Sequence, residues 1–425
     1  MPLRGPHAAI ALVHYTSPPI IGGVEAVLGR HARLLADRGC DVRVITGRGG
    51  ALGARVRVRH VPLLDSRHPR VLAVTEQLAQ GRVTPAFAAL SAQVQDGLER
   101  TLAGASVCVV HNALTLHKNL ALTAALHRLA ARRPPIRFVA WCHDLAWTNP
   151  QYRGELHAGQ PWRLLTTPLP GATYVAVSRD RQRALSAALH LGPSHIEVIP
   201  NGIDPAVFLR LSPAGRWLAD TLRLWDQQLV LLLPVRITRR KQIEYALRVT
   251  GELVRRELSV RLLVTGPLGA HNPRNPAYLD ELRALRAALG LEEQVVFCAE
   301  VPGPRGEPFA LSDRVVADLY ALADALLLPS REEGFGLTLL EAGLARLPAF
   351  VSDIPPLREI GGDAVQTFGL DDSPAVCAQR IVHTLMDDRA YRLRRRILAT
   401  YTWDVIMRDR IMPLLTQLTA AVRPT

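Results

Sequence analysis

Short apolar runs alternate with longer amphipathic stretches along most of this chain. A short apolar run between turn residues is typical of a buried strand, whereas apolar positions at helical spacing indicate a helix. The apolar runs predict strands at residues 8–14, 41–46, 55–64, 106–110, 136–142, 173–177, 196–199, 229–235, 260–265, 294–297, 325–329 and 349–352. Strands that alternate with helices in this way predict an α/β fold with parallel sheets.

A break near the middle divides the chain. The turn residues Pro200, Asn201 and Gly202 follow one predicted strand, and the strand pattern starts afresh at 229–235. The chain has 425 residues, a length that suits two domains of about 200 residues each. We expect the domains at 1–203 and 204–400, followed by a helical segment at 401–425.

Composition narrows the class of protein. The apolar content of 48% predicts a globular protein with a large core, and no apolar run has the length of about 18 residues that a membrane-spanning helix needs. The first residues lack the plan of a signal peptide. The five cysteines are scattered without a C-x-x-C pair, which argues against a disulfide framework or a zinc site and fits a reduced cytoplasm. We therefore predict a cytoplasmic protein with no metal site.

The net charge of +13 would suit anionic ligands, nucleic acid or a membrane surface, but arginine is spread through the predicted helices rather than clustered. We predict no nucleic-acid partner; a peripheral membrane contact and the oligomeric state stay open. Of the 51 basic residues, only Lys118 and Lys241 are lysine. Arginine is thus the default cation, so a retained lysine favours a need for a compact point charge, although chance can also leave two lysines anywhere.

Residues 330–342 form the most informative stretch, because they join a predicted strand to a predicted helix. Gly334 and Gly336 let the backbone come close to a ligand, and the amide groups at the start of the helix suit a phosphate. Glu333 lies in the turn and Glu341 lies more than one turn into the helix. A glycine turn between a strand and a helix is common, but the two glutamates favour a nucleotide-sugar site.

The segment from Glu333 to Glu341 resembles the E-x7-E signature of the retaining glycosyltransferases of family four. The resemblance implies the GT-B fold, in which two Rossmann-like domains with parallel sheets face a central cleft and the last helix crosses back to the first domain. It implies that Glu333 holds hydroxyls of the donor sugar and that Glu341 binds the ribose. Donor-binding positions implied between them are Gly334, Phe335, Gly336, Leu337 and Thr338.

Further segments resemble the same family. Arg236 and Lys241 have the spacing of its GR-x4-K motif, whose charged residues hold the donor diphosphate. Val235 and Gln242 stand where the family usually has glycine, which weakens the match without changing the charged pair. Because lysine is so scarce in this chain, its retention at the phosphate position favours a functional role for Lys241.

The other donor-side positions lie at a glycine turn and at strand ends. Gly22 and Gly23 open the first helix without the G-x-G-x-x-G of a dinucleotide site, and the resemblance places this loop near the donor diphosphate. His143 resembles the family's strand-end histidine beside the donor sugar. Gly266 follows the strand at 260–265, at the end that faces the cleft in this fold.

Three polar residues in the first half are candidates to bind the acceptor. His111 and Asn112 follow the strand at 106–110, and Lys118 lies in a helix expected to begin near residue 115. A lysine, a histidine and helix amide groups suit a carboxylate or phosphate, which predicts a small anionic acceptor such as a sugar acid or a phosphorylated polyol. Alternatively, Lys118 is an ordinary solvated side chain and the histidine is structural.

Aromatic residues gather in the same region. Trp141, Trp147, Tyr152 and Trp162 fall within 22 residues, although aromatics make up only 5% of the chain. Aromatic faces stack well on sugar rings. Trp141 lies inside a strand and is expected in the core, whereas Trp147 and Tyr152 are candidates to cover the acceptor, with core filling as the alternative.

Together these features predict a retaining glycosyltransferase that moves a hexose, of glucose or mannose type, from UDP-, GDP- or ADP-hexose to an acceptor hydroxyl. No Asp-x-Asp motif stands at a strand end, so Arg236, Lys241 and helix N-termini are expected to balance the diphosphate charge without a metal or cofactor. For this fold the resemblance implies front-face attack, in which the leaving phosphate helps to deprotonate the acceptor.

Two other interpretations stay open. The first is a sugar phosphorylase of the same fold, but a pyridoxal-dependent one would need a Schiff-base lysine late in the chain, and no lysine follows Lys241. The second is a nucleotide-sugar-binding regulator or an inactive paralogue. The complete set of charged site residues argues against such a loss of activity.

Overall fold

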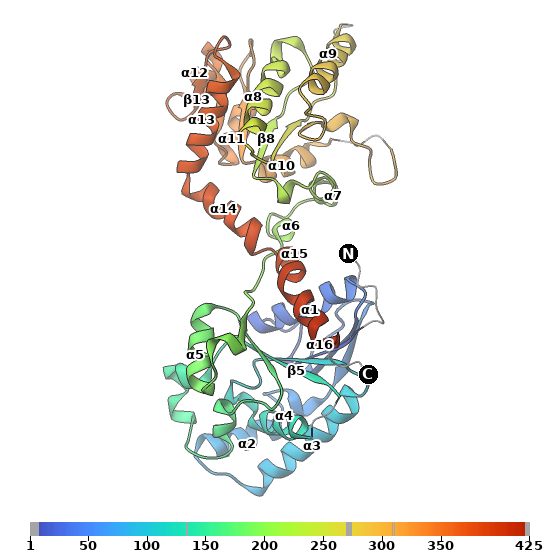
Figure 1. The fold of residues 1–425 in the computed structure, drawn as a ribbon, viewed down its shortest axis with the longest axis vertical. Helices are drawn as coiled ribbons and strands as arrows, with labels where there is room; N and C mark the ends of the chain where they lie inside the picture. The colour runs from blue at the N-terminus through green and yellow to red at the C-terminus, as the bar shows by residue number, and fades with distance from the viewer. Residues whose placement is uncertain (1–7, 133–134, 269–273, 308, 310, 421–425) are drawn as a thin grey trace. The chain divides into compact units, whose positions relative to one another are not determined.

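The computed structural model describes residues 8–132, 135–268, 274–307, 309 and 311–420. The chain divides into two compact units: unit 1 comprises residues 1–202 and 403–425, and unit 2 comprises residues 203–402. Each unit is built around a parallel sheet with helices packed on it, as Figure 1 shows. This arrangement confirms the predicted α/β class with two Rossmann-like domains.

Unit 1 has a seven-stranded sheet in the order β3-β2-β1-β4-β5-β6-β7. Its strands are β1 (Ala9–Thr16), β2 (Asp41–Arg48), β3 (Val56–His60), β4 (Val107–His111), β5 (Arg137–Cys142), β6 (Thr173–Ala176) and β7 (Ile196–Val198). Its helices are α1 (Gly23–Asp37), α2 (Pro69–Ala79), α3 (Pro85–Leu102), α4 (Leu120–Ala131), α5 (Arg179–Leu189), α15 (Trp403–Ile406) and α16 (Met412–Ala420). Strand β1 pairs with both β2 and β4, so the strand order reverses between β1 and β4. Ligands in such sheets bind beyond the carboxyl ends of strands at this reversal.

The sheet of unit 1 is buried on both faces. Leu12 of β1 packs in the cluster that holds Leu28 of α1, whereas its neighbour Val13 packs in the cluster that holds Leu122 of α4. Adjacent residues of a strand point to opposite faces, so a fully apolar strand is expected here. The residues after 402 complete the first of these clusters with Ile406, Met407, Ile411 and Leu415.

Unit 2 has a six-stranded sheet in the order β10-β9-β8-β11-β12-β13. Its strands are β8 (Leu229–Leu233), β9 (Val260–Val264), β10 (Val295–Phe297), β11 (Ala325–Leu328), β12 (Ala349–Ser352) and β13 (Gln366–Phe368). Its helices are α6 (Pro205–Phe208), α7 (Pro213–Thr221), α8 (Ile243–Arg255), α9 (Asn275–Ala288), α10 (Asp313–Leu322), α11 (Leu337–Leu344), α12 (Pro355–Gly361), α13 (Pro374–Asp387) and α14 (Arg389–Thr400). The strand order reverses between β8 and β11, which places the loops after these two strands side by side.

Two local predictions differ from the structure. The strand expected at 55–64 ends at His60, and a 3₁₀ turn at Pro62–Leu64 follows. The helix expected near residue 115 begins at Leu120, after a one-turn 3₁₀ helix at His117–Asn119. The side chain of Asn119 caps it by accepting a hydrogen bond from the Leu122 amide at 3.1 Å, so the helix starts where this cap is available.

The C-terminal segment, predicted to be helical, contains a π-helical stretch at Met407–Ile411 between α15 and α16. Pro413 follows this stretch and has no amide hydrogen to donate back along the helix, and a local change of helix type is a common way to accommodate such a residue. In the described part of the chain, no helix is long and apolar enough to cross a lipid bilayer.

Candidate functional site

The loop between β11 and α11 in unit 2 holds the paired glycines of the sequence motif. Gly336 has φ +111°, and a Cβ at this position would stand 2.8 Å from Leu357 Cδ2 of α12. A glycine is therefore required here both for the backbone conformation and for the packing of α12. Gly334 has open space around it. Phe335 and Leu337 beside them are 54% and 65% exposed, so this loop presents apolar side chains to its surroundings.

Glu333 and Lys241 form an ion pair at the carboxyl edge of the sheet of unit 2. The Lys241 ammonium lies 2.5 Å from Glu333 Oε1, and both side chains are about nine-tenths buried. Ser330 Oγ donates to the same carboxylate oxygen at 2.7 Å. Lys241 comes from the loop after β8 and Glu333 from the loop after β11, and these two strands are neighbours. The sheet thus joins two residues of separate motifs that are 92 positions apart in the sequence.

The two loops are also joined by their arginines. The amide of Arg331 donates to the carbonyl of Arg240 at 2.8 Å, and the Arg240 guanidinium donates to the Glu332 carbonyl at 3.1 Å. The same guanidinium lies 3.9 Å from Glu333 Oε2. Glu333 is therefore held between a lysine and an arginine, in two loops that these hydrogen bonds join.

The second glutamate of the motif has a partner that the sequence did not indicate. Tyr320 of α10 donates its hydroxyl hydrogen to Glu341 Oε2 at 2.6 Å, and the Thr338 carbonyl lies 3.2 Å from the same hydroxyl. Burial, together with the Glu341 carboxylate, raises the pKa of Tyr320, so the phenol stays protonated and keeps donating. Tyr320 thereby fixes the position of Glu341 on the first turns of α11. A buried tyrosine in an amphipathic helix has no sequence signal that separates it from ordinary core.

The remaining donor-side residues of unit 2 have different surroundings. Arg236 is exposed beyond the end of β8. Gly266 is buried at the end of β9, where a Cβ would come within 1.9 Å of the Val235 carbonyl oxygen. The glycine at 266 is thus required for the close packing of two loops, whatever ligand lies near it.

In unit 1, the candidate histidine His143 follows β5 and contacts His111 at the end of β4. Their ring nitrogens, His143 Nε2 and His111 Nδ1, are 3.3 Å apart. His111 is fully buried, whereas His143 is 8% exposed. His111 is therefore better placed to orient the ring of His143 than to touch an acceptor itself.

Asn112 organises the loop after β5. Its backbone has φ +57°, and its side-chain oxygen accepts hydrogen bonds from the amides of His143 at 2.8 Å and Asp144 at 2.9 Å. Its side-chain amide donates to Asp144 Oδ2 at 3.2 Å. Asn tolerates the left-handed conformation better than most residues, and its side chain here replaces backbone pairing that the loop lacks. Asn112, like His111, positions His143.

Four histidines of unit 1 are buried in one region: His14, His31, His111 and His143. Burial lowers the pKa of His143 to about 4 and that of His31 to about 3, and it lowers the pKa of His111 as well. These rings are neutral near pH 7. Within the described residues, the Nε2 atoms of His31 and His111 have no hydrogen-bond partner. His31 could not be singled out from the sequence, because one histidine on a helix has no signal of its own.

The glycine turn before α1 holds a carboxylate of the same chain. A Cβ at Gly22 would stand 2.0 Å from Glu25 Oε2, so the Glu25 side chain folds back over the start of the helix. Thr16 donates to Glu25 Oε1 at 2.6 Å, and His14 Nε2 lies 3.7 Å from the same oxygen. Glu25 is the third residue of α1, a position at which a glutamate stabilises a helix N-terminus. Gly23 has open space around it.

The candidate acceptor residues form a second group in unit 1. The Lys118 ammonium lies over the ring of Tyr152, 4.3 Å from its centroid. His117 next to it forms a 2.7 Å contact with Glu155. Trp147 is 39% exposed, while Trp141 is buried as expected. Lys118 thus forms a cation–π contact with Tyr152, which favours one position of its ammonium group.

Two family models match the chain. One, described as Glycosyltransferase Family 4, matches residues 21–207, and the other, described as Glycosyl transferases group 1, matches residues 221–399. The chain belongs to the family 4 glycosyltransferases. This glycosyltransferase has its E-x7-E segment and its Arg236–Lys241 pair inside the second match, and its glycine turn and His143 inside the first.

Curated relatives agree with this assignment. The D-inositol 3-phosphate glycosyltransferase of Kineococcus radiotolerans is 28% identical over 402 residues, which cover 87% of this chain and 84% of the relative. The D-inositol 3-phosphate glycosyltransferase 1 of Catenulispora acidiphila is 26% identical over 412 residues, covering 91% and 88%. Several named glycosyltransferases are thus similar to this enzyme along most of their length.

Solved structures are similar at a lower level. A sucrose-phosphate synthase from Thermosynechococcus elongatus has a TM-score of 0.39 at 18% identity, covering 98% of this chain and all of that one. WaaG, a glycosyltransferase involved in lipopolysaccharide biosynthesis, has a TM-score of 0.35 at 19% identity, covering 98% of this chain and all of that one. Similarity at this level does not bear on the substrates of this enzyme. In the described part of the chain, no three side chains of His, Cys, Asp or Glu are grouped to hold a metal ion.

Proposed function

We propose that this glycosyltransferase transfers a hexosyl group from a nucleotide-diphosphate hexose to a hydroxyl of a phosphorylated polyol, with retention of the anomeric configuration. The observation that carries the proposal is the Lys241–Glu333 ion pair beside the start of α11. It brings a phosphate-binding cation and a hydroxyl-binding carboxylate to one point at the carboxyl edge of a parallel sheet. A donor that carries a diphosphate next to a sugar offers a partner to each of these groups.

Lys241 has three N–H donors and gives one of them to Glu333. The other two are available to oxygens of the donor diphosphate, and Arg236 and the amide groups at the start of α11 add positive charge. As the bond between the anomeric carbon and the phosphate oxygen breaks, negative charge grows on the phosphate. A cation already fixed by Glu333 stabilises that charge without having to reorganise.

Retention follows if the acceptor oxygen attacks the face that the phosphate leaves. In this step the new bond between the anomeric carbon and the acceptor oxygen forms as the old one breaks, and the acceptor proton passes to the departing phosphate oxygen. No protein base is then needed, and we propose no metal in this step. Glu333 accepts hydrogen bonds from donor sugar hydroxyls, and Glu341, fixed by Tyr320, accepts from the ribose.

His143 adds a neutral group on the side of unit 1. Its pKa of about 4 keeps the imidazole uncharged at neutral pH, so it offers a hydrogen bond to a sugar hydroxyl without attracting the diphosphate. Asn112 and His111 fix its orientation. Because the ring is neutral, this partner adds no charge beside the diphosphate and costs little to desolvate.

The acceptor class rests on Lys118 and on the relatives. Lys118 is one of two lysines, and its ammonium is held over Tyr152. Relatives similar along most of this chain carry the name D-inositol 3-phosphate glycosyltransferase, which describes a phosphorylated polyol as acceptor.

The five cysteines are free and buried, which fits work in the reducing cytoplasm.

The test is a released-nucleotide assay with UDP-, GDP- and ADP-hexoses, each offered with inositol phosphate or with inositol. We expect one donor to react and inositol phosphate to exceed inositol. Lys118→Ala should raise the acceptor KM about 10-fold or more and leave the donor KM unchanged, because one charge-assisted hydrogen bond is lost. Arg153→Ala, a change to an exposed cation next to Tyr152 in the sequence, is the matched control.

Three results would contradict parts of the proposal. Equal rates with inositol and inositol phosphate would contradict the proposed anionic acceptor. Inversion of the anomeric centre in the product would contradict the proposed front-face mechanism. Binding of a donor without nucleotide release with any acceptor tried would favour a nucleotide-sugar-binding protein instead.

A further inference from the structure

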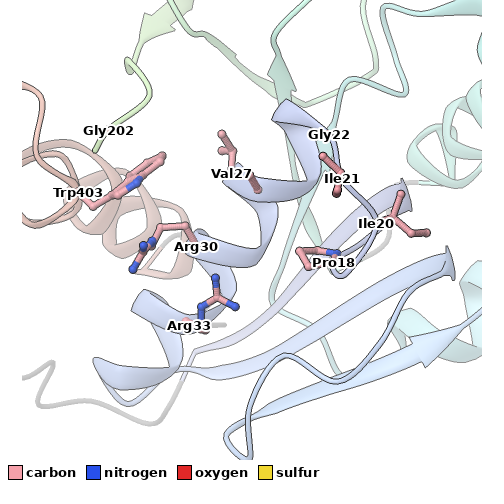
Figure 2. Close-up of a pocket in the computed structure, with 10 residues that line it drawn as sticks. Pro18, Ile20, Ile21, Gly22, Val27, Arg30, Arg33, Gly202 and Trp403 are labelled. Carbon is pink, nitrogen blue, oxygen red and sulfur yellow. The ribbon is translucent and has the colours of Figure 1, made fainter. Parts of the chain in front are cut away.

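Unit 1 contains a hollow of about 470 Å³ that is separate from the histidine and lysine groups described above. It lies between the loop after β1, the outer side of α1, and the point where the chain leaves unit 1 at Gly202 and returns at Trp403. Its volume falls in the range of small-molecule sites. Figure 2 shows the side chains that line it.

The lining of this hollow is polarised. Arg30 and Arg33 of α1 lie on the side of Trp403, while Ile20 and Ile21 lie beyond Pro18 (Figure 2). One end is therefore cationic and the other apolar. Ile21 is fully exposed, so the apolar end carries a large side chain that is open to solvent.

Arg33 is exposed and also lines this hollow. A Cβ built on Gly29 would stand 3.7 Å from Arg33 Nη2 and 2.8 Å from Pro18 Cγ, so the guanidinium and the proline ring lie on the same patch of α1. Gly202 packs against Trp403, because a Cβ at Gly202 would stand 2.7 Å from its indole ring, and both residues line the hollow. The charged and apolar walls are therefore close enough for one small ligand to touch both.

The chemistry of the ten lining residues narrows the chemical class of ligand that the hollow can bind. Besides the two arginines and Trp403 they are Pro18, Ile20, Ile21, Gly22, Ala26, Val27 and Gly202. Among these ten there is no acidic residue and no serine, threonine, asparagine or glutamine. A sugar or a nucleobase would bury hydroxyl or amide groups against a wall that offers few partners, which costs free energy. An anion with an apolar chain meets no such cost.

We propose that this hollow binds an anionic amphiphile, with a phosphate at Arg30 and Arg33 and an alkyl chain along Pro18, Ile20 and Ile21. Two guanidiniums on neighbouring turns of a helix match a phosphate, which accepts several hydrogen bonds at once. The exposed Ile21 extends the apolar wall toward solvent, where the rest of a lipid chain continues. The ligand is either a lipid taken from a membrane surface or a free alkyl phosphate, since both present the same chemistry.

The test measures binding to the full-length protein by calorimetry and involves no transferase assay, so it is independent of the proposed function. Octyl phosphate, below its micellar concentration, should bind at least about 10-fold more tightly than inorganic phosphate or octanol, because only it fills both ends. Ile21→Ser and Arg33→Gln should each weaken octyl phosphate binding on the order of 10-fold. Both side chains are exposed, so neither change removes core packing.

Two matched controls show whether the effect is local. Val83→Ser removes an apolar side chain of unit 1 that is 52% exposed, and Arg59→Gln removes an exposed cation of β3. Both should leave octyl phosphate binding within about twofold of the unmodified chain. An equal loss in the controls and in the Ile21 and Arg33 variants would mean general detergent-like binding and would overturn the proposal.

Two further outcomes would also overturn it: inorganic phosphate binding as tightly as octyl phosphate, or Ile21→Ser without effect. The source of the ligand is decided by sedimentation with phosphatidylcholine vesicles, with and without phosphatidylglycerol. If the protein cosediments only with vesicles that contain phosphatidylglycerol, and the Ile21→Ser variant cosediments less, the ligand is a membrane lipid. Octyl phosphate binding without cosedimentation assigns a free alkyl phosphate.

Discussion

The two units carry the same kind of parallel sheet, but the side chains beyond the carboxyl ends of their strands differ in charge. In unit 2 a lysine and a glutamate pair at 2.5 Å between neighbouring strands. In unit 1 the corresponding edge holds histidines that burial keeps neutral. In parallel sheets the topology determines where ligands can bind, whereas the residues at the strand ends determine the chemistry that each edge offers. A charged edge offers a cation for phosphate oxygens and carboxylates for hydroxyls, whereas a neutral edge offers hydrogen bonds without charge.

The largest effect is expected at the charged edge. Glu333→Gln keeps the shape of the side chain but removes its charge, so the fixed partner of Lys241 is lost. Turnover should fall on the order of 10²–10³-fold, about 2–4 kcal/mol in the barrier, with a smaller change in donor KM. Steady-state kinetics with the active donor measure both. Glu332→Gln, at the exposed neighbouring residue, is the control and should keep a rate near that of the unmodified chain. Full activity in both variants would show that Glu333 has no part in the reaction.

Lys241 should be the next most sensitive position. A planar guanidinium cannot replace a compact ammonium that faces a carboxylate in a nearly buried site. Lys241→Arg and Lys241→Ala should therefore both weaken donor binding, measured by calorimetry, about 10-fold or more. Arg248→Lys on the exposed side of α8 should change nothing. If donor affinity is the same in both Lys241 variants as in the unmodified chain, the lysine was retained by chance.

The neutral edge predicts a dependence of stability on pH. His143 and His31 have folded pKa values of about 4 and 3, below the value of 6.5 in an unfolded chain. At a pH between the folded and unfolded pKa values, the unfolded chain binds more protons than the folded chain. The free energy of unfolding is therefore full above pH 6.5 and declines as the pH falls toward 4. Each such histidine contributes about 1.4 kcal/mol per pH unit in that window. Urea unfolding between pH 7 and pH 4, followed by tryptophan fluorescence, measures the slope.

The variant His31→Phe removes one of these groups and keeps a ring. The slope of unfolding free energy against pH should then fall by about 1.4 kcal/mol per pH unit. His383→Phe changes a histidine of unit 2 whose side chain is 80% exposed and should leave the slope unchanged. Equal slopes for both variants would show that buried histidines do not set the acid sensitivity.

The smallest effects concern the glycine turns, which occur in both units. Gly336→Ala should cost about 1–3 kcal/mol, because it forces a side chain into the left-handed region against α12. Gly22→Ala should cost about 1 kcal/mol, since it displaces the Glu25 carboxylate from the helix N-terminus. Gly23→Ala and Gly334→Ala meet open space and should lie within about 0.5 kcal/mol of zero. Thermal unfolding that ranks Gly23→Ala above Gly22→Ala in cost would contradict the stabilising role of the Glu25 carboxylate.

Sequence alone was sufficient where a local pattern carries the information. The run Leu229–Leu233 is fully buried in β8, as its apolar pattern predicted. The Arg236–Lys241 and Glu333–Glu341 segments were placed at strand ends by the same pattern, and the family models confirm the family that they suggested. Such features depend on residues close together in the sequence, so they can be predicted without coordinates.

Features that depend on contacts between distant elements could not be predicted. The ion pair of Lys241 with Glu333 requires the knowledge that β8 and β11 are neighbours. The partnership of Tyr320 with Glu341 and the burial of His31 depend in the same way on tertiary packing. The turn that holds Lys118 was expected to be helical. The helix begins only at Leu120, because Asn119 caps it through one hydrogen bond, and a single bond of this kind has no sequence pattern that predicts it.

The return of the chain to unit 1 has a consequence for biosynthesis. The first unit lacks Ile406, Met407, Ile411 and Leu415 of its core until the ribosome has passed residue 402. Unit 2 needs only residues 203–402 and can complete its core earlier. Domains usually finish folding in the order of their synthesis. Here the unit that is begun first is completed last, so its unfinished apolar face must stay soluble, or bound by a chaperone, while the whole of the other unit is being made.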